Sequence, residues 1–301
     1  MVSKIRRLGI VIALGLVLLL GITVLATSYS EPGVTCEIGT GGLPLTLSDF
    51  SDIPQSVVDD ATELSVQMFG DCQEKGDDFV NQLLAVYSEA KDEDFVVVFN
   101  PGGWGWNSAE ASPGWWSIFN GIKSELESLG YTSLMLNYER SVDSFLGRLD
   151  EMGEMITGYQ SKAKDLACSA EFLTTHIPHL KVILAGESTG TVITDSAMNI
   201  LANDPRVYSI GTGPPFWHQP TMSERTLVLT DNGIIPDSFS HGDFLTIIWG
   251  NLRALFGLSE PAGDSGTILH YVGAPGHDYW WQYPEVCFQI TNFLRQNFGI
   301  R

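Results

Sequence analysis

Short apolar runs alternate with longer amphipathic stretches along most of the chain. The apolar runs are rich in β-branched residues and predict strands at residues 95–99, 132–136, 182–185, 207–210, 226–229 and 268–272. Strands that are apolar on both faces and separated by helices are typical of a parallel sheet with helices on either side. The pattern therefore predicts an α/β fold with a mainly parallel sheet of about six strands.

The stretches between these runs carry apolar residues at helical spacing. They predict helices at residues 54–69, 77–90, 116–129, 151–176, 189–202 and 284–297. Residues 27–52 are rich in Gly, Ser, Thr and Pro, which is typical of a flexible tether. Residues 53–301 contain no recognisable linker, so we expect them to form one domain.

The beginning of the chain has the charge pattern of a membrane-directing segment. Lys4, Arg6 and Arg7 precede residues 8–26, which contain no charged side chain. As a helix this stretch would be about 28 Å long, close to the thickness of a bilayer's hydrocarbon core. We therefore expect residues 1–26 to be a transmembrane helix that anchors the chain in the cell membrane by a single pass, with the remainder extracytoplasmic. A cleaved signal sequence is the alternative and would give a secreted protein.

The chain is strongly acidic, with 36 Asp and Glu residues against 16 Lys and Arg residues and a formal net charge of −20. Binding to the phosphate backbone of a nucleic acid requires a basic surface. Nucleic acid is therefore excluded as a partner, and we interpret the acidic balance as a source of solubility.

Four cysteines are compatible with disulfides in the oxidising compartment that this topology implies. Three pairings are possible, and we favour Cys36 with Cys72 because both precede the first strong strand. Cys168 and Cys287 lie in predicted helices, where buried free thiols are common. The absence of a Cys-x-x-Cys pair argues against a metal site built from thiolates.

The most informative short motif is Gly-Glu-Ser-Thr-Gly at residues 186–190, between a predicted strand and a predicted helix. Small residues at Gly186 and Gly190 allow a sharp strand-to-helix turn that exposes the hydroxyl of Ser188. The same turn directs the first N–H groups of the following helix, beginning with Thr189, toward any oxyanion formed at an attacked carbonyl. The motif therefore makes Ser188 a candidate nucleophile.

With this serine turn, the alternation of strands and helices and a late histidine, the chain resembles the α/β-hydrolase superfamily of serine esterases and lipases over about residues 95–298. The resemblance implies the order nucleophile, acid, histidine, with Ser188 as the nucleophile. It also places the histidine in the loop after the last strand. His277 is the histidine between that strand and the closing helix, and an imidazole can take and return the serine proton near neutral pH.

The resemblance places the acid after the strand at residues 226–229. Asp231 directly follows this strand and is our first choice, with Asp237 second and Asp243 third. The segment departs from the family pattern, because matching Ile235 and Pro236 to it puts Asn232 at the acid position. Each of these aspartates could instead cap a turn.

The second oxyanion donor in this family comes from the loop after the strand at residues 95–99. We assign it to the backbone N–H of Gly103 or Trp104, with Thr189 as its partner. An ordinary glycine-rich turn without a ligand is the alternative.

All eight tryptophans fall in segments that the fold would send to the catalytic rim or its cap, an insertion at about residues 217–265. Large aromatic side chains around one pocket favour apolar substrates. We expect four tryptophans to line the substrate pocket: Trp106, Trp115, Trp217 and Trp280. Residues 244–258 are almost uncharged and predict either a lid over an apolar site or a crossover helix packed on the sheet.

Together these features predict a serine hydrolase that cleaves carboxylic esters, with hydrophobic or lipid-like acyl groups preferred, through an acyl-enzyme on Ser188. The resemblance implies no metal and no organic cofactor. Two alternatives remain open: a peptidase or thioesterase with the same triad, and a catalytically inactive binding module that kept the fold. The sequence does not indicate the oligomeric state.

Overall fold

The computed structural model describes residues 50–70, 72–141, 145–255, 266–268 and 272–299. The predicted membrane segment at residues 8–26 lies outside this part, as does most of the predicted tether. Within the described residues, no helix combines the length and the apolar character needed to cross a bilayer.

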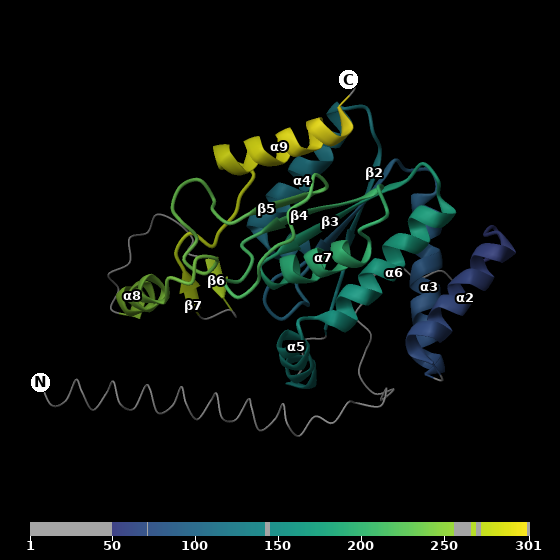
Figure 1. Ribbon diagram of the computed structural model, residues 1–301, viewed down its shortest axis with the longest axis horizontal. Coiled ribbons are helices and arrows are strands. Elements are labelled where there is room, and N and C mark those ends of the chain that lie inside the picture. The colour runs from purple at the N-terminus through teal and green to yellow at the C-terminus, as the bar shows by residue number, and fades with distance from the viewer. Residues whose placement is uncertain (1–49, 71, 142–144, 256–265, 269–271, 300–301) are drawn as a thin grey trace, which may run out of the picture. The chain divides into compact units, whose positions relative to one another are not determined.

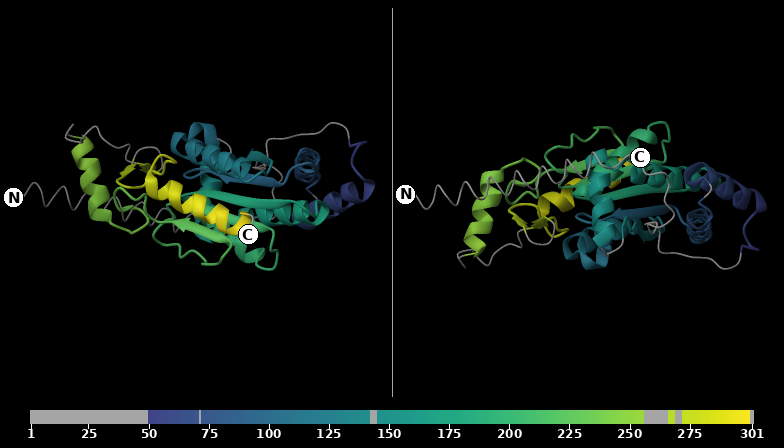
Figure 2. Two further views of the ribbon diagram at one scale, coloured as in Figure 1. Left: turned by 90° about the horizontal axis from the view of Figure 1, so that it is seen from above. Right: turned by 90° about the horizontal axis from the view of Figure 1, so that it is seen from below.

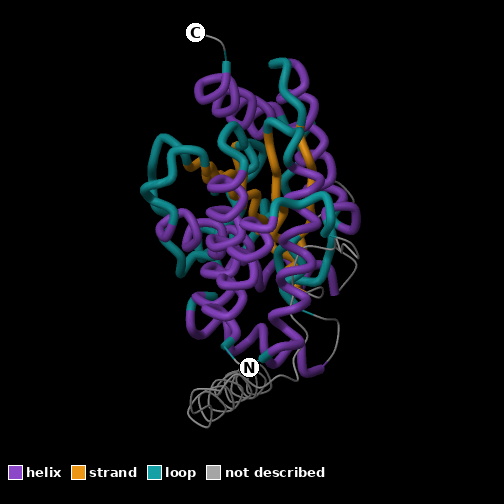
Figure 3. The backbone as a smooth tube through the Cα atoms, turned by 90° about the vertical axis from the view of Figure 1, so that its right-hand side faces the viewer, coloured by secondary structure: helices purple, strands orange, loops and turns teal. Residues whose placement is uncertain are grey.

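A five-stranded parallel sheet forms the centre of the fold (Figures 1 and 3). In spatial order its strands are β2 (Ser133–Asn137), β1 (Phe95–Asn100), β3 (Lys181–Glu187), β4 (Val207–Thr212) and β5 (Thr226–Leu229). The first five predicted strands are therefore present with nearly the expected bounds. The prediction of a sixth strand in this sheet is wrong, because the described residues of that region form a separate antiparallel pair, β6 (Gly266–Ile268) and β7 (Val272–Ala274).

Helices cover both faces of the sheet (Figure 2). Alternate residues of β1 point to opposite faces, so Val96 and Val98 join one core while Phe95, Val97 and Phe99 join the other. The first core is closed by α2 (Gln55–Phe69), α3 (Gln73–Ala90), α6 (Gln160–His176) and α7 (Thr189–Ile200), and the second by α4 (Pro113–Ser128) and α9 (Pro284–Phe298). Burial on both faces explains why the strands are almost continuously apolar.

The long helix predicted at residues 151–176 is two helices in the structure, α5 (Phe145–Thr157) and α6. The break occurs at Gly158 and Tyr159, which both have positive φ angles, 75° and 59°. Tyr159 has a buried side chain, and its left-handed backbone conformation interrupts the helical ladder. The periodicity of apolar residues continues across this break, so it did not reveal the interruption.

A short 3-10 turn, η1 (Ala109–Ala111), precedes α4. The helix of the predicted insertion, α8 (Phe244–Leu255), lies beside β6 and β7 (Figures 1 and 2). Asn251 holds it there, since its amide group donates to the carbonyl of Gly273 at 2.8 Å and accepts from the N–H of Gly273 at 2.9 Å. α8 is therefore not a crossover helix packed on the five-stranded sheet.

Cys168 and Cys287 carry free, partly buried thiols, which is the alternative that the sequence analysis left open for them. Cys36 lies outside the described residues, so its pairing with Cys72 stays a prediction.

Candidate active site

The turn between β3 and α7 holds Ser188 in a strained backbone conformation, with φ 51° and ψ −116°. The two flanking glycines are required by close packing. A Cβ atom on Gly186 would lie 2.8 Å from the carbonyl of Gly190, and one on Gly190 would lie 2.2 Å from the backbone oxygen of Asn100. The N–H of Ser188 donates to the carbonyl of Thr212 at 2.8 Å, which ties the turn to the neighbouring strand β4. This is the strand-to-helix turn that the sequence predicts.

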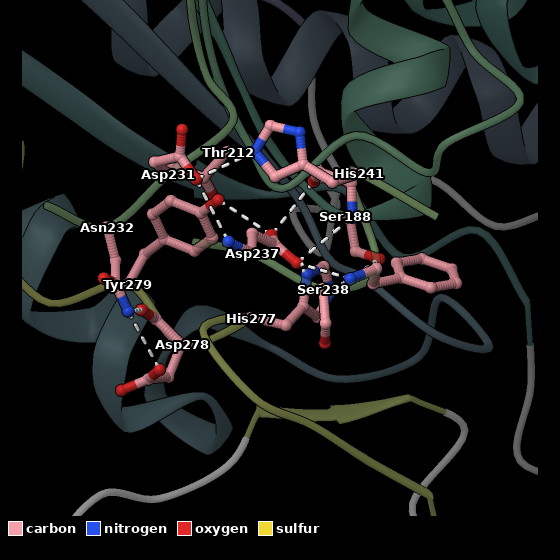
Figure 4. Close-up of polar contacts among 12 residues, drawn as sticks. Ser188, Thr212, Asp231, Asn232, Asp237, Ser238, His241, His277, Asp278 and Tyr279 are labelled. Atoms are coloured by element: carbon pink, nitrogen blue, oxygen red, sulfur yellow. Dashed lines mark hydrogen bonds and ion pairs between the residues drawn. The ribbon is translucent and has the colours of Figure 1, made fainter. Parts of the chain in front are cut away.

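His277 lies within hydrogen-bond distance of the serine (Figure 4). Its Nε2 atom is 3.1 Å from Oγ of Ser188, and its side chain is only 7% exposed. The histidine belongs to the loop between β7 and α9, and its own N–H donates to the carbonyl of Ala274 at 3.0 Å. The predicted nucleophile and the predicted base are thus brought together from segments 89 residues apart in the chain.

The carboxylate beside His277 belongs to Asp237, the second choice from the sequence. Oδ2 of Asp237 lies 2.8 Å from Nδ1 of His277, and the aspartate is completely buried. The same oxygen accepts hydrogen bonds from the hydroxyls of Tyr279 at 2.8 Å and Ser240 at 2.9 Å. Oδ1 accepts from the N–H groups of Phe239 at 2.9 Å and Ser240 at 3.1 Å. All five groups around the carboxylate are therefore able to donate to it.

Burial by itself raises the pKa of Asp237, but the surrounding groups more than compensate. The hydrogen bond from His277 and its charge, the N–H of Ser240 and the hydroxyl of Tyr279 together hold the pKa below the usual value for an aspartate. Asp237 is therefore ionised at neutral pH and can stabilise a positive charge on His277.

The other two candidate acids have structural roles. Asp231 is half exposed, and its Oδ1 accepts from the N–H of Asp237 at 3.0 Å and lies 2.9 Å from Nε2 of His241. Asp231 thus holds the backbone at Asp237 in place. Within the described residues it makes no hydrogen bond to His277, which pairs with Asp237 instead. Asp243 accepts from the N–H and the hydroxyl of Thr246 at 3.1 and 2.6 Å and caps the start of α8. Neither aspartate therefore occupies the position expected of a triad acid.

The loop after β1, which the sequence analysis expects to supply an oxyanion donor, passes directly beside Ser188. A Cβ atom on Gly102 would lie 3.1 Å from Cβ of Ser188, and the N–H of Gly102 donates to Oε2 of Glu187 at 3.1 Å. Desolvation raises the pKa of Glu187. Gly103 has a φ of 58°, and its carbonyl accepts from the hydroxyl of Thr189 at 3.2 Å. Thr189 is the first residue of α7, so its N–H has no acceptor within the helix and is open to a ligand.

The predicted pocket tryptophans do not form one group. Trp115 is 1% exposed, packs against Phe99 in the core, and donates its indole N–H to the hydroxyl of Thr212 at 3.0 Å. The structure therefore places Trp115 in the core and not at the surface of a pocket, because α4 turns this side chain toward the sheet. Trp106 is partly buried and stacks on Trp104, with the two ring planes 3° apart. Trp280 is also partly buried and lies near Gly114.

An aromatic cluster leads away from His277 to the surface. Phe239 contacts the imidazole with ring centroids 5.0 Å apart, and Trp217 lies 5.5 Å from Phe239. Phe216 contacts Phe239, Trp217 and Phe244, the first residue of α8. Of the four tryptophans expected in the pocket, Trp217 is the one placed in this cluster, and it is 49% exposed.

Several groups at this site were not identified from the sequence. Tyr279 donates to the carboxylate of Asp237, and the buried pair Arg140 and Glu151 lies behind the loop that follows β1. Arg140 stands three residues beyond the end of β2, at the same edge of the sheet as Ser188. A charged residue just beyond the carboxyl end of a parallel strand is a usable signal for such a group.

No family model and no curated protein matches the chain. Among solved structures it is similar to a cutinase from Trichoderma reesei in complex with a phosphonate inhibitor, at 15% identity and a TM-score of 0.44, over 84% of this chain and 94% of that one. It is also similar to a cutinase-like protein from Cryptococcus sp., at 14% identity and a TM-score of 0.36, over 68% of this chain and 95% of that one. At this level of likeness, the function has to be inferred from the residues of the chain itself.

Proposed function

We propose that the protein is a serine hydrolase that cleaves carboxylic esters, with Ser188 as nucleophile, His277 as general base and Asp237 as the supporting acid. The observation that carries this proposal is the continuous hydrogen-bonded chain from Oγ of Ser188 through the imidazole to a buried carboxylate, with distances of 3.1 and 2.8 Å. The strained turn at Ser188 supports it, since such strain is costly and is concentrated at functional sites.

The reaction follows from these positions. Nε2 of His277 takes the hydroxyl proton while Oγ of Ser188 bonds to the ester carbonyl carbon, and the positive imidazole is stabilised by Asp237. The N–H of Thr189, with a second N–H from Gly103 or Trp104, stabilises the negative oxygen. The intermediate collapses to an acyl-enzyme as the alcohol leaves with the proton from His277. Water activated by His277 then releases the carboxylic acid by the same steps.

Hydrophobic acyl groups are the substrates that the surroundings of His277 favour. The aromatic side chains of Phe216, Trp217 and Phe239 extend from the imidazole to the surface and offer apolar contacts to an acyl chain or an aromatic ring. A small-molecule or lipid-like ester is therefore the proposed partner.

Two experiments test this function. A fluorophosphonate probe should label the wild-type protein and fail to label Ser188→Ala, while Ser128→Ala, an exposed serine at the end of α4, should label normally. Labelling of Ser188→Ala at the wild-type level would show that the nucleophile is wrong. Hydrolysis of p-nitrophenyl esters, compared with acyl thioesters and peptides, separates an esterase from the thioesterase and peptidase alternatives.

The alternative of an inactive binding module predicts a carboxylate out of reach of His277. The distance of 2.8 Å between Asp237 and His277 speaks against it.

We further propose that residues 8–26 tether this domain to the membrane on its extracytoplasmic side, or direct its secretion if they are removed. Detection of the chain in the membrane fraction after a carbonate wash favours the tether, and detection of a shortened chain in the medium favours secretion.

A further inference from the structure

Arg140 is a fully buried charged side chain behind the loop that follows β1, the loop proposed to supply the second oxyanion donor. Arg140 is 0% exposed and is joined to Glu151 of α5, which is 2% exposed. Both Nε and Nη2 of the arginine donate to Oε1 of the glutamate, at 3.1 and 2.8 Å. Removing two charges from water is costly, and a buried ion pair is weak evidence for a contribution to stability. Its placement therefore calls for another explanation.

The other contacts of the guanidinium group reach the loop that follows β1 and the first residue of α7. Nη1 donates to the carbonyl of Pro101, and Nη2 lies 3.2 Å from the carbonyl of Gly103 and 3.2 Å from the hydroxyl of Thr189. The backbone N–H of Arg140 donates to the carbonyl of Gly105 at 2.9 Å. One guanidinium group thus bridges the loop that follows β1 and the first residue of α7.

These contacts fix the direction of specific backbone N–H groups. In a planar trans peptide the C=O and the following N–H point in opposite directions. Because the carbonyl of Gly103 is directed at Arg140 and Thr189, the N–H of Trp104 is directed away from them. The peptide between Pro101 and Gly102 is held at both ends, since the carbonyl of Pro101 contacts Arg140 and the N–H of Gly102 donates to Glu187. The N–H of Gly102 is therefore already used, and that of Trp104 points away from Thr189. The N–H of Gly103 is the remaining candidate donor, and its direction is fixed because the carbonyl of Gly102 accepts from the N–H of Gly105 at 3.3 Å.

We infer that Arg140, held by Glu151, is a positioning residue of the oxyanion hole, a role that rests on the proposed function. It fixes the loop at Pro101 and Gly103 relative to Thr189, so that the N–H groups of Gly103 and Thr189 converge on the oxygen of the attacked carbonyl. A lysine cannot replace it, because a single ammonium group on a flexible stem lacks the planar fork that reaches several acceptors at once.

The test compares Arg140→Lys with Arg225→Lys. Arg225 is a suitable control, because its guanidinium also binds backbone carbonyls, those of Ala202, Asp204 and Val207, at the amino end of the sheet and far from Ser188 along the strands. For each protein we would measure kcat and KM for p-nitrophenyl butyrate, with the concentration of active sites determined by titration with a fluorophosphonate. We would also measure the Kd of a trifluoromethyl ketone, which forms a tetrahedral adduct, and the midpoint of unfolding.

For Arg140→Lys we expect kcat to fall about 10- to 100-fold with KM within twofold, since a small displacement of an oxyanion donor is costly. The Kd of the ketone should rise by a similar factor. Arg225→Lys should lower the unfolding midpoint and leave kcat within twofold. If Arg140→Lys does not fold, Glu151→Asp keeps both charges but withdraws the carboxylate, and it should lower kcat by about 3- to 10-fold.

The role of Arg140 is overturned if Arg140→Lys, or Glu151→Asp in its place, leaves both kcat and the affinity for the ketone unchanged. It is also overturned if Arg225→Lys loses as much kcat as Arg140→Lys. Either result leaves the proposed function itself standing. A wild-type protein that reacts with neither probe nor ester overturns the proposed function and this role with it.

Discussion

Replacing Asp237 by asparagine changes one atom of the proposed triad and should nearly abolish the proposed ester hydrolysis. The carboxylate is surrounded by five donors, of which the N–H groups of Phe239 and Ser240 contact Oδ1. These two backbone donors cannot reverse their role, so they retain the amide oxygen of the asparagine. The amide NH2 group must then occupy the place of Oδ2, opposite Nδ1 of His277.

An NH2 group at this place selects the wrong form of the imidazole. It donates to Nδ1 of His277, so the ring proton moves to Nε2, and Nε2 can no longer accept the proton of Ser188. Loss of the correct tautomer in a serine triad lowers kcat by about 10⁴-fold, which corresponds to about 5.4 kcal/mol of transition-state stabilisation. The second hydrogen of the amide can be accepted by the hydroxyl of either Tyr279 or Ser240 after rotation, so the fold should remain intact.

Asp231→Asn is the matched control, since it makes the same chemical change six residues away. Its amide oxygen can still accept from the N–H of Asp237, and its lost charge is half exposed, so we expect kcat to stay within about threefold of wild type. The assay is p-nitrophenyl butyrate hydrolysis at neutral pH, with folding checked by circular dichroism. Retention of more than a tenth of the activity by Asp237→Asn, or an equal loss in Asp231→Asn, would refute this assignment of the acid.

Three further predictions concern the supporting structure. Gly190→Ala should lower the free energy of unfolding by about 1–3 kcal/mol and also lower kcat, because its Cβ would lie 2.2 Å from the backbone oxygen of Asn100. Chemical denaturation would measure the first effect and the ester assay the second. A variant with wild-type stability and activity would contradict the close packing. Tyr279→Phe removes one hydrogen-bond donor from the carboxylate of Asp237 and should cost about 1–3 kcal/mol of stability. Its loss of kcat should be smaller than that of Asp237→Asn, and the same two assays measure both effects. Equal losses of kcat in the two variants would contradict this prediction. Burial raises the pKa of Asp165 to about 6, so its contribution to stability is present below pH 3.8 and is lost as the pH rises through 6, by at most about 3 kcal/mol. Asp165→Asn keeps an acceptor for the hydroxyl of Tyr138 and should therefore be more stable than wild type at pH 8 but not at pH 4. Thermal melts at both pH values would measure this. A difference in stability between variant and wild type that does not change with pH would contradict the raised pKa of Asp165.

The sheet and the serine turn could be predicted from the sequence because their signals are local. Each of the first five predicted strands is a short apolar run in the sequence, and the residues that shape the turn at Ser188 lie within five consecutive positions. The sixth strand has the same apolar pattern, but a pattern does not specify which neighbour a strand pairs with. The described part of that region pairs β6 with β7, so the prediction failed at the step from strand to sheet.

The carboxylate that contacts His277 could not be ranked first from the sequence, because its position is set by contacts far along the chain. Proximity to the end of β5 favoured Asp231, but the segment folds back on itself through a bridge between Asp231 and Pro236. The loop that follows is fastened to the histidine loop, since both the N–H and the hydroxyl of Ser238 donate to the carbonyl of Pro275. Asp237 therefore reaches His277 through pairings about 40 residues apart, which no local pattern encodes.

The same distinction separates the groups proposed to react from those that hold them in place. Ser188 and His277 were found because their chemistry is rare and the turn or loop around them is recognisable. Asp231, Tyr279 and Arg140 belong to no short motif, and each contacts a different part of the site. Asp231 contacts the backbone of Asp237, Tyr279 contacts the carboxylate of Asp237, and Arg140 contacts the loop that follows β1. A buried or bridging polar group at the carboxyl edge of a parallel sheet should therefore be tested for positioning before it is treated as structural, because burial without a positioning role would leave its desolvation cost unexplained.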